Sequence, residues 1–193
     1  DLCEPRSEFE RAVLDFCAQW KSGKSSFLFY TSGSTGLPKP IWVDRKSMEA
    51  SALCTGNWLQ LKPNDMALAC LPVQNIAGAM VVVRALVLNL QVCLVEPSVN
   101  PLINLHPISL QLASFVPNQW HAILKSKIDL SSFFQNAKGI LLGGSSLSEN
   151  LIMASKDFHW PIFETYGMTE TVSHVAFKPI GLSYFQTFDG VET

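Results

Sequence analysis

The chain has 193 residues, of which 48% are hydrophobic and only 16% are charged. This composition is typical of a globular protein with a substantial core and excludes an intrinsically disordered chain. The formal net charge of −2 offers no basic surface to nucleic acid, and no apolar run is long enough to span a bilayer. We therefore expect one domain that neither binds nucleic acid nor spans a membrane.

Predicted strands and helices alternate along the chain. The first element is an amphipathic helix over residues 6–20, in which Ser7 and Glu10 have the spacing of a capping box. Short apolar runs bounded by turn residues predict strands at 26–30, 41–43, 66–73, 91–96, 109–116, 139–144 and 161–167. Apolar periodicity predicts helices at 44–58, 76–89, from Pro117 onwards and at 148–157. This alternation predicts an α/β fold, in which helices flank a mostly parallel sheet.

The five cysteines predict neither a disulfide framework nor a zinc site. Their number is odd and no pair has the C-x-x-C spacing: Cys3, Cys17, Cys54, Cys70 and Cys93. The simplest interpretation is that they are small, mostly buried side chains in a reducing compartment. The first residues, DLCEPRSEFE, do not resemble a signal peptide, so a cytoplasmic location is expected.

The segment YTSGSTGLPKP, residues 30–40, has the composition of a phosphate-binding loop, and we call its residues 31–39 the Ser/Thr/Gly loop. Its glycines allow backbone N–H groups to converge on an anion, its hydroxyls add rotatable donors, and Lys39 adds a positive charge. The loop directly follows a predicted strand, and ligands of α/β sheets collect at the carboxyl ends of strands. The spacing does not fit a Walker loop, and Gly23 is expected in a turn that ends the first helix.

Three later segments strengthen this interpretation. They are LPVQNIAGAM (71–80), ILLGGSSLSENLI (140–152) and ETYGMTET (164–171), and we call the last one the second signature. Together with the Ser/Thr/Gly loop, and in the same order, they resemble the adenylate-forming enzymes, a superfamily of acyl- and aryl-CoA synthetases, luciferases and peptide-synthetase adenylation domains. The resemblance extends over residues 26–180.

Within that superfamily, SFVPNQWHAIL (114–124) is most similar to the corresponding turn of o-succinylbenzoate–CoA ligases, which act in menaquinone synthesis. Plant-type aryl-CoA ligases and short fatty acyl-CoA synthetases are the alternatives. The resemblance implies a two-step reaction with ATP, Mg²⁺ and coenzyme A. A carboxylate first attacks the α-phosphate of ATP and releases pyrophosphate, and coenzyme A then displaces AMP. Such chemistry needs positioning and charge screening between two anions rather than a general base.

The resemblance also implies roles for individual residues. The β- and γ-phosphates would lie against Thr31, Ser32, Gly33, Ser34, Thr35 and Gly36, with Lys39 anchoring the loop. Thr169 would contact the α-phosphate, and Glu170 would bind Mg²⁺. The adenine slot would be formed by Gly144, Ser145, Glu164, Thr165, Tyr166 and Gly167, with the Tyr166 ring stacked on the base. The acyl pocket would draw on Asn75, Gln119, Gly143 and Ser173.

Several of these residues have simpler interpretations when they are taken singly. Tyr166 is then a half-buried strand aromatic, and Glu170 is a carboxylate in the first turn of a helix. Asn75 replaces the aromatic or histidine residue that the superfamily usually has there. His174, just after the second signature, is expected to be an ordinary surface or core histidine.

Members of the superfamily continue beyond the second signature with a ribose-binding aspartate and a small C-terminal domain that carries a lysine. Residues 1–193 are therefore expected to be part of the large adenylation domain, without the C-terminal lid domain and with poor turnover. The alternative from another class is a non-catalytic nucleotide-binding module. The sequence leaves open the identity of the carboxylate and whether the chain forms a homodimer.

Overall fold

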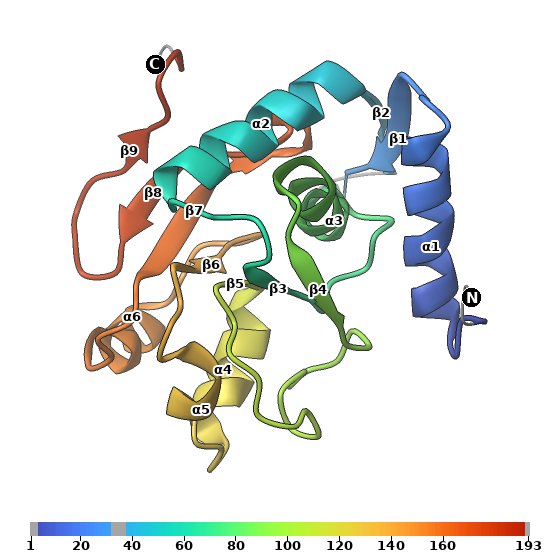
Figure 1. Cartoon of the computed structure of the whole chain (residues 1–193). Helices are drawn as coiled ribbons and strands as arrows, with labels where there is room; N and C mark the ends of the chain where they lie inside the picture. The colour runs from blue at the N-terminus through green and yellow to red at the C-terminus, as the bar shows by residue number, and fades with distance from the viewer. Residues whose placement is uncertain (1–3, 32–37, 192–193) are drawn as a thin grey trace.

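The computed structural model describes residues 4–31 and 38–191. Within these residues, helices cover both faces of a seven-stranded sheet, and a separate two-stranded hairpin lies beside α1 (Figure 1). The strands of the large sheet follow the order β4-β3-β5-β6-β7-β8-β9. No helix in the described ranges is both long enough and apolar enough to cross a membrane.

The large sheet is mostly parallel. Its parallel strands are β3 (Met66–Ala69), β4 (Gln91–Leu94), β5 (Leu112–Phe115), β6 (Gly139–Leu142) and β7 (Ile162–Met168). Two antiparallel strands extend the edge beyond β7, namely β8 (Ser173–Pro179) and β9 (Gln186–Thr187). The predicted fold class, α/β with a mostly parallel sheet flanked by helices, is confirmed.

The helices form a layer on each face of the sheet. Their bounds are α1 (Glu8–Lys21), α2 (Arg45–Trp58), α3 (Ile76–Leu88), α4 (Pro117–Lys125), α5 (Ser131–Phe134) and α6 (Glu149–Lys156), with a short 3₁₀ helix η1 (Thr169–Thr171). Figure 1 shows α2 and α3 on one side of the sheet and α4, α5 and α6 on the other.

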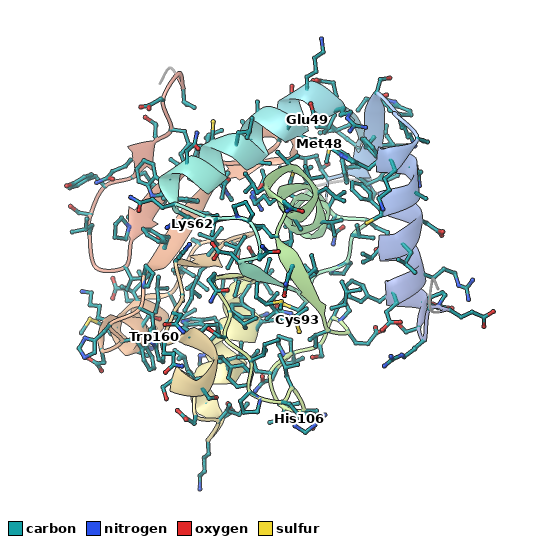
Figure 2. All side chains as sticks on the ribbon, viewed as in Figure 1. Met48, Glu49, Lys62, Cys93, His106 and Trp160 are labelled. Atoms are coloured by element: carbon teal, nitrogen blue, oxygen red, sulfur yellow. The ribbon has the colours of Figure 1, made fainter. Side chains whose placement is uncertain are left out.

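The core follows the period-two alternation of the strands. Ala67 and Leu141 face the α2–α3 layer, whereas Leu68 and Ile140 face the α4–α6 layer. Side chains fill the interior on both sides of the sheet (Figure 2), with Trp160 packed against the α4–α6 cluster. Both faces are therefore buried, as a parallel sheet requires.

The ends of the helices agree with the sequence prediction in most details. Pro117 is the first residue of α4, and Gly23 follows α1 with a φ of +83°. Ser7 caps α1 by accepting a hydrogen bond from the Glu10 N–H at 3.1 Å. The predicted capping box is nevertheless only half formed, because the Glu10 carboxylate accepts from the Arg6 N–H at 2.7 Å instead of turning back to Ser7.

The placement of the first two strands corrects the prediction. β1 (Ser26–Tyr30) and β2 (Pro40–Asp44) form an antiparallel hairpin of their own and do not join the parallel sheet. The reason is the short connection between them, since a parallel crossover needs a dozen or more residues. The strand before the Ser/Thr/Gly loop, β1, therefore belongs to an antiparallel pair and not to the parallel sheet.

The sequence analysis also missed α5, β8 and β9. The predicted strand at 161–167 was expected to run into a loop, but β7 continues to Met168 and the chain reverses over η1 into β8. The reversal includes a register shift between Tyr166 and Gly167. A bulge of this kind depends on the neighbouring strand, so the local sequence pattern does not predict it.

Candidate functional site

Several of the predicted site residues that the structure describes lie at one edge of the large sheet. Those that follow β3, β5 and β6 are Asn75, Gln119 and Gly143, and the second signature forms the end of β7 and the turn η1. The carboxyl ends of adjacent parallel strands share an edge, and the four strands are neighbours in the sheet. η1 also contacts β2. The second signature thus lies beside the hairpin that carries the Ser/Thr/Gly loop.

Two hydrogen bonds join Thr31 and Lys39, the ends of the Ser/Thr/Gly loop. The Thr31 N–H donates to the Lys39 carbonyl at 3.1 Å, and the Lys39 N–H lies 3.4 Å from Thr31 Oγ1. The side chain of Lys39 is exposed. The remaining predicted phosphate contacts lie outside the described residues, namely Ser32, Gly33, Ser34, Thr35 and Gly36.

The turn after β6 lies close to the Thr165 side chain of β7. A Cβ on Gly143 would lie 2.2 Å from Thr165 Oγ1, and that hydroxyl donates to the Leu142 carbonyl at 3.2 Å. Gly144 follows with a φ of +87°, a conformation that side chains disfavour, and Ser145 is exposed. Gly143, predicted for the acyl pocket, and Gly144, predicted for the adenine slot, thus lie in one turn beside β7, and both roles remain predictions.

The other predicted adenine contacts lie on β7. Glu164 forms an ion pair with Lys178 of β8 at 2.7 Å, and both side chains are largely buried. The ammonium of Lys178 lies 4.7 Å from the centre of the Phe185 ring. Tyr166 is 56% exposed, with its ring centre 5.7 Å from that of Phe185. Its ring is thus accessible to a planar ligand, and the stacking role remains a prediction.

The turn η1 exposes the predicted metal ligand. Thr171 Oγ1 accepts from the Met168 N–H at 3.0 Å and donates to the Ser173 carbonyl at 2.8 Å, which closes the turn. Glu170 is exposed on the turn, and within the described residues its carboxylate forms no ion pair. A single carboxylate that is free in this way suits Mg²⁺, which usually takes one or two protein carboxylates together with phosphate oxygens and water.

The predicted acyl contacts have different surroundings. Asn75 is exposed and precedes α3 without a side-chain capping bond. Gln119 is only 5% exposed. Its amide donates to the Ser98 carbonyl at 2.9 Å and to the Cys70 carbonyl at 3.4 Å, and it accepts from the Val116 N–H at 3.2 Å. Gln119 therefore joins the start of α4 to the segments that follow β3 and β4, and its contact with a substrate remains a prediction.

A buried polar cluster that the sequence did not predict lies next to the second signature. Arg84 is 1% exposed, and its Nη2 lies 3.2 Å from His174 Nε2. Thr55 Oγ1 lies 2.9 Å from the same ring nitrogen. The available signal was Arg84 itself, a charge in the middle of an otherwise apolar helix, which is rarely tolerated without a buried partner.

Burial changes the titration of this cluster. Desolvation lowers the pKa of Arg84 to about 9, which still leaves its guanidinium charged at neutral pH. Burial first, and then the charge of Arg84, lower the pKa of His174 well below its ordinary value of 6.5. His174 is therefore a neutral, buried histidine beside a buried cation.

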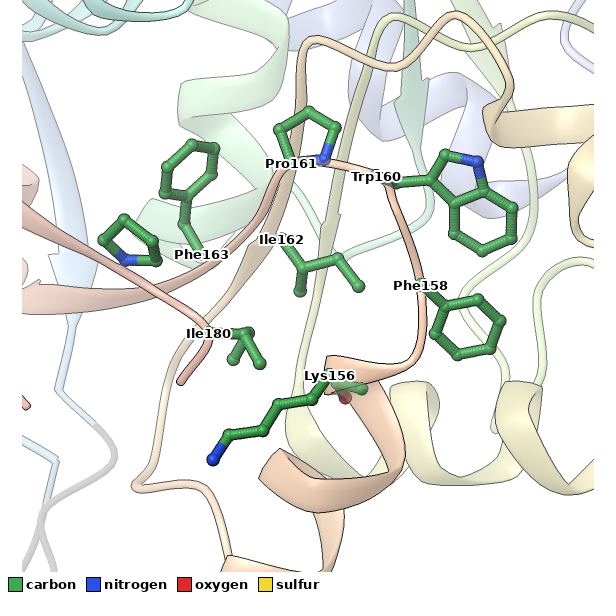
Figure 3. A pocket seen from close by; sticks show the side chains of 9 residues that line it. Lys156, Phe158, Trp160, Pro161, Ile162, Phe163 and Ile180 are labelled. Atoms are coloured by element: carbon green, nitrogen blue, oxygen red, sulfur yellow. The ribbon is translucent and has the colours of Figure 1, made fainter. Parts of the chain in front are cut away.

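Two cavities lie at opposite ends of the β7–β8 region. One, of about 240 Å³, lies between α2 and the turn, and its lining includes Ser51, Val172 and His174. The other, of about 330 Å³, is lined mainly by apolar side chains at the start of β7, among them Trp160 and Ile162 (Figure 3). None of the predicted site residues in the described ranges lines either cavity, but the smaller one is lined by Thr171 at the end of the second signature.

Solved structures of adenylate-forming enzymes are similar to this chain. The acyl-CoA synthetase (AMP-forming)/AMP-acid ligase II-like protein from Dyadobacter fermentans is 37% identical, with a TM-score of 0.87 over 96% of this chain and 54% of that one. O-succinylbenzoate coenzyme A synthetase from Bacillus subtilis, in complex with ATP and magnesium ion, is 28% identical, with a TM-score of 0.66 over 79% of this chain and 32% of that one.

Curated relatives and a family model agree with these structures. The 2-succinylbenzoate–CoA ligase of Listeria innocua is 28% identical over 86% of this chain and 35% of its own length. The chain thus spans about a third of the length of such relatives. The resemblance to adenylate-forming enzymes is confirmed. The model of the AMP-binding enzymes matches residues 6–188, and the chain belongs to that family.

Proposed function

We propose that the protein activates a carboxylic acid with ATP as an acyl-adenylate and then transfers the acyl group to coenzyme A. The observation that carries this proposal is the contact between η1 and β2, which brings Thr169 and Glu170 beside the hairpin of the Ser/Thr/Gly loop. A carboxylate and a triphosphate repel each other, so such a reaction depends on donors and charges held around the phosphates.

Each predicted site segment has a role in this proposal. The Ser/Thr/Gly loop and Lys39 hold the β- and γ-phosphates, while the hydroxyl of Thr169 contacts the α-phosphate. Glu170 is the ligand for Mg²⁺, which would neutralise phosphate charge when bound. The exposed Tyr166 ring stacks on adenine above the turn at Gly144. No side chain removes a proton, because the attacking carboxylate is already an anion.

We further propose that the carboxylic acid is o-succinylbenzoate, which would place the protein in menaquinone synthesis. The names of the relatives support this choice.

The extent of the domain belongs to the same proposal. Residues 1–193 would form part of the large adenylation domain, and the lid domain would lie outside this sequence. A cytoplasmic location, where ATP and coenzyme A are available, fits this activity. The rival proposal is a nucleotide-binding module without chemistry, which would bind ATP but release no pyrophosphate.

The natural full-length polypeptide tests these proposals in one assay. It is incubated with ATP, Mg²⁺, coenzyme A and one of three acids: o-succinylbenzoate, benzoylpropionate (the same skeleton without the ring carboxylate) or octanoate. Pyrophosphate release and the mass of the acyl-CoA product are measured. We expect o-succinylbenzoate to react fastest. Equal rates with benzoylpropionate would exclude a role for the second carboxylate, and ATP binding without pyrophosphate release from any acid would favour the non-catalytic module.

A further inference from the structure

Three buried side chains join three elements next to the second signature. Thr55 lies on α2, Arg84 on α3 and His174 at the start of β8, and we call these three residues the buried clamp. We propose that the buried clamp, with His174 as its central positioning residue, fixes the turn over residues 169–173 so that Thr169 and Glu170 face the hairpin. The functional half of this inference rests on the roles proposed above for Thr169 and Glu170.

The turn that the clamp adjoins is strained. Val172 has a φ of +59° and Ser173 a φ of +90°, so two consecutive residues with side chains adopt conformations that favour glycine. Val172 is also β-branched, which makes the conformation less favourable still. Such backbone geometry persists only where the surroundings hold it in place.

Contacts from α2 hold both sides of the strained pair. The Ser51 hydroxyl donates to the Val172 carbonyl at 3.2 Å, and one helical turn later Thr55 contacts the His174 ring at 2.9 Å. Ser51 and Thr55 are four residues apart and therefore lie on the same face of the helix. The helix thus binds the residue at the start of the strained pair and the residue just after it.

β7 restricts the same turn from the other side. A Cβ on Gly167 would lie 1.9 Å from the Ser173 carbonyl oxygen, so the backbones of β7 and β8 are in direct contact there. The Ser173 carbonyl is also the acceptor for Thr171 Oγ1 at 2.8 Å. A shift of His174 along β8 would therefore displace Ser173 and, through it, the turn that exposes Glu170.

The chemistry of the clamp requires a neutral acceptor at position 174. A guanidinium carries only donors, so His174 Nε2, which faces Arg84, must be the accepting nitrogen, and Nδ1 carries the hydrogen. Burial first, and then the charge of Arg84, lower the pKa of His174, which keeps the ring neutral and so preserves this acceptor. The Phe177 and Phe188 rings pack against the imidazole, with ring centres 4.6 and 5.7 Å away, and restrict its orientation.

A matched pair of substitutions separates the acceptor from the bulk of the side chain. His174→Gln can place an amide oxygen near the position of Nε2, whereas His174→Asn reaches only the position of Nδ1 and leaves Arg84 without an acceptor. Amide hydrogen exchange over residues 168–175 is measured on the full-length protein without ligand. We expect exchange in His174→Asn to rise about tenfold, since local opening becomes easier, and in His174→Gln to stay within about twofold of the wild type.

A milder pair covers the case in which neither variant at position 174 folds. Thr55→Val removes the hydroxyl, which lies 2.9 Å from His174 Nε2 and also donates to the Ser51 carbonyl within α2 at 2.9 Å, and Thr55→Ser keeps both contacts. We expect Thr55→Val to increase exchange over residues 168–175 by about threefold relative to Thr55→Ser. Equal exchange in the two Thr55 variants, or in the two folded His174 variants, would overturn the proposal.

A functional readout distinguishes positioning from simple stabilisation. The Mg²⁺ concentration that gives half-maximal pyrophosphate release is determined at a temperature where each variant is fully folded. We expect His174→Asn to need about tenfold more Mg²⁺ than His174→Gln, because Glu170 is less well placed. A lower melting temperature with an unchanged Mg²⁺ requirement would overturn the positioning role. If exchange changes as expected but the wild type releases no pyrophosphate, the positioning of the turn stands and the proposed function fails.

Discussion

The hairpin of β1 and β2 and the reversal from β7 through η1 to β8 carry the two signatures, but they are stabilised differently. The hairpin turns an exposed face to solvent, on which Trp42 is 65% exposed, and local backbone contacts join Thr31 to Lys39. The reversal instead contains strained backbone that is held by Ser51 and the buried clamp, far away in the sequence. Substitutions in the hairpin should therefore change only their immediate surroundings. Substitutions in or around the reversal should change the conformation of the turn through its buried contacts.

The largest effect that this comparison predicts is on chemistry at the reversal. Glu170→Gln removes the charge of the proposed Mg²⁺ ligand from an exposed position, so adenylation should slow on the order of 10²–10³-fold while the fold is unchanged. Pyrophosphate release at limiting Mg²⁺ is the measurement, with the melting temperature as the control for folding. Unchanged kinetics at limiting Mg²⁺ would contradict the role of Glu170.

A pair of glycine substitutions compares crowding with backbone conformation. Gly167→Ala places a methyl group 1.9 Å from the Ser173 carbonyl, so the strands must separate, and the free energy of unfolding should fall by about 1–3 kcal/mol. Gly23→Ala, at the turn that leads into β1, has a φ of +83° but open space around it, and should lose only about 1 kcal/mol. Denaturant unfolding measures both. A larger loss at Gly23 would contradict the picture of a crowded reversal.

The third prediction concerns pH and the buried clamp. Because the folded-state pKa of His174 lies well below the unfolded value of 6.5, its contribution to stability is complete above about pH 6.5 and is lost as the pH falls, since the unfolded chain then binds the extra proton. The slope from this residue should approach about 1.4 kcal/mol per pH unit below that point. The difference in unfolding free energy between wild type and His174→Gln, measured from pH 7.5 to 5, isolates this contribution. A difference that does not vary with pH would contradict it.

The same contrast explains how far the sequence could predict the structure. Helix starts such as Pro117 and the buried strands follow from local signals, and so does the composition of the Ser/Thr/Gly loop. The antiparallel pairing of β1 with β2 was not predicted, because an apolar strand has the same pattern in a parallel and in an antiparallel pair. The contact between Arg84 and His174 joins residues that are 90 positions apart. No local pattern encodes such a partner, so the buried clamp and the strained turn could not be predicted.

The smallest predicted effect is on the affinity for ATP, and it concerns Lys39 in the hairpin of β1 and β2. Lys39 is exposed, and its backbone, not its side chain, closes the hairpin, so Lys39→Gln should leave the melting temperature unchanged. An exposed charge contributes about 0.2–1 kcal/mol to an ionic contact, so ATP binding should weaken only a few-fold, and less at high salt because screening already reduces the attraction.

Calorimetric titration of ATP at low and high ionic strength is the measurement, with Lys62→Gln, an exposed lysine after α2, as the matched control. Equal loss of affinity in both variants would show that Lys39 contributes only to the general field of the protein and does not contact the phosphates. A loss confined to Lys39→Gln that disappears at high salt would support the proposed anchoring of the polyphosphate at the hairpin tip.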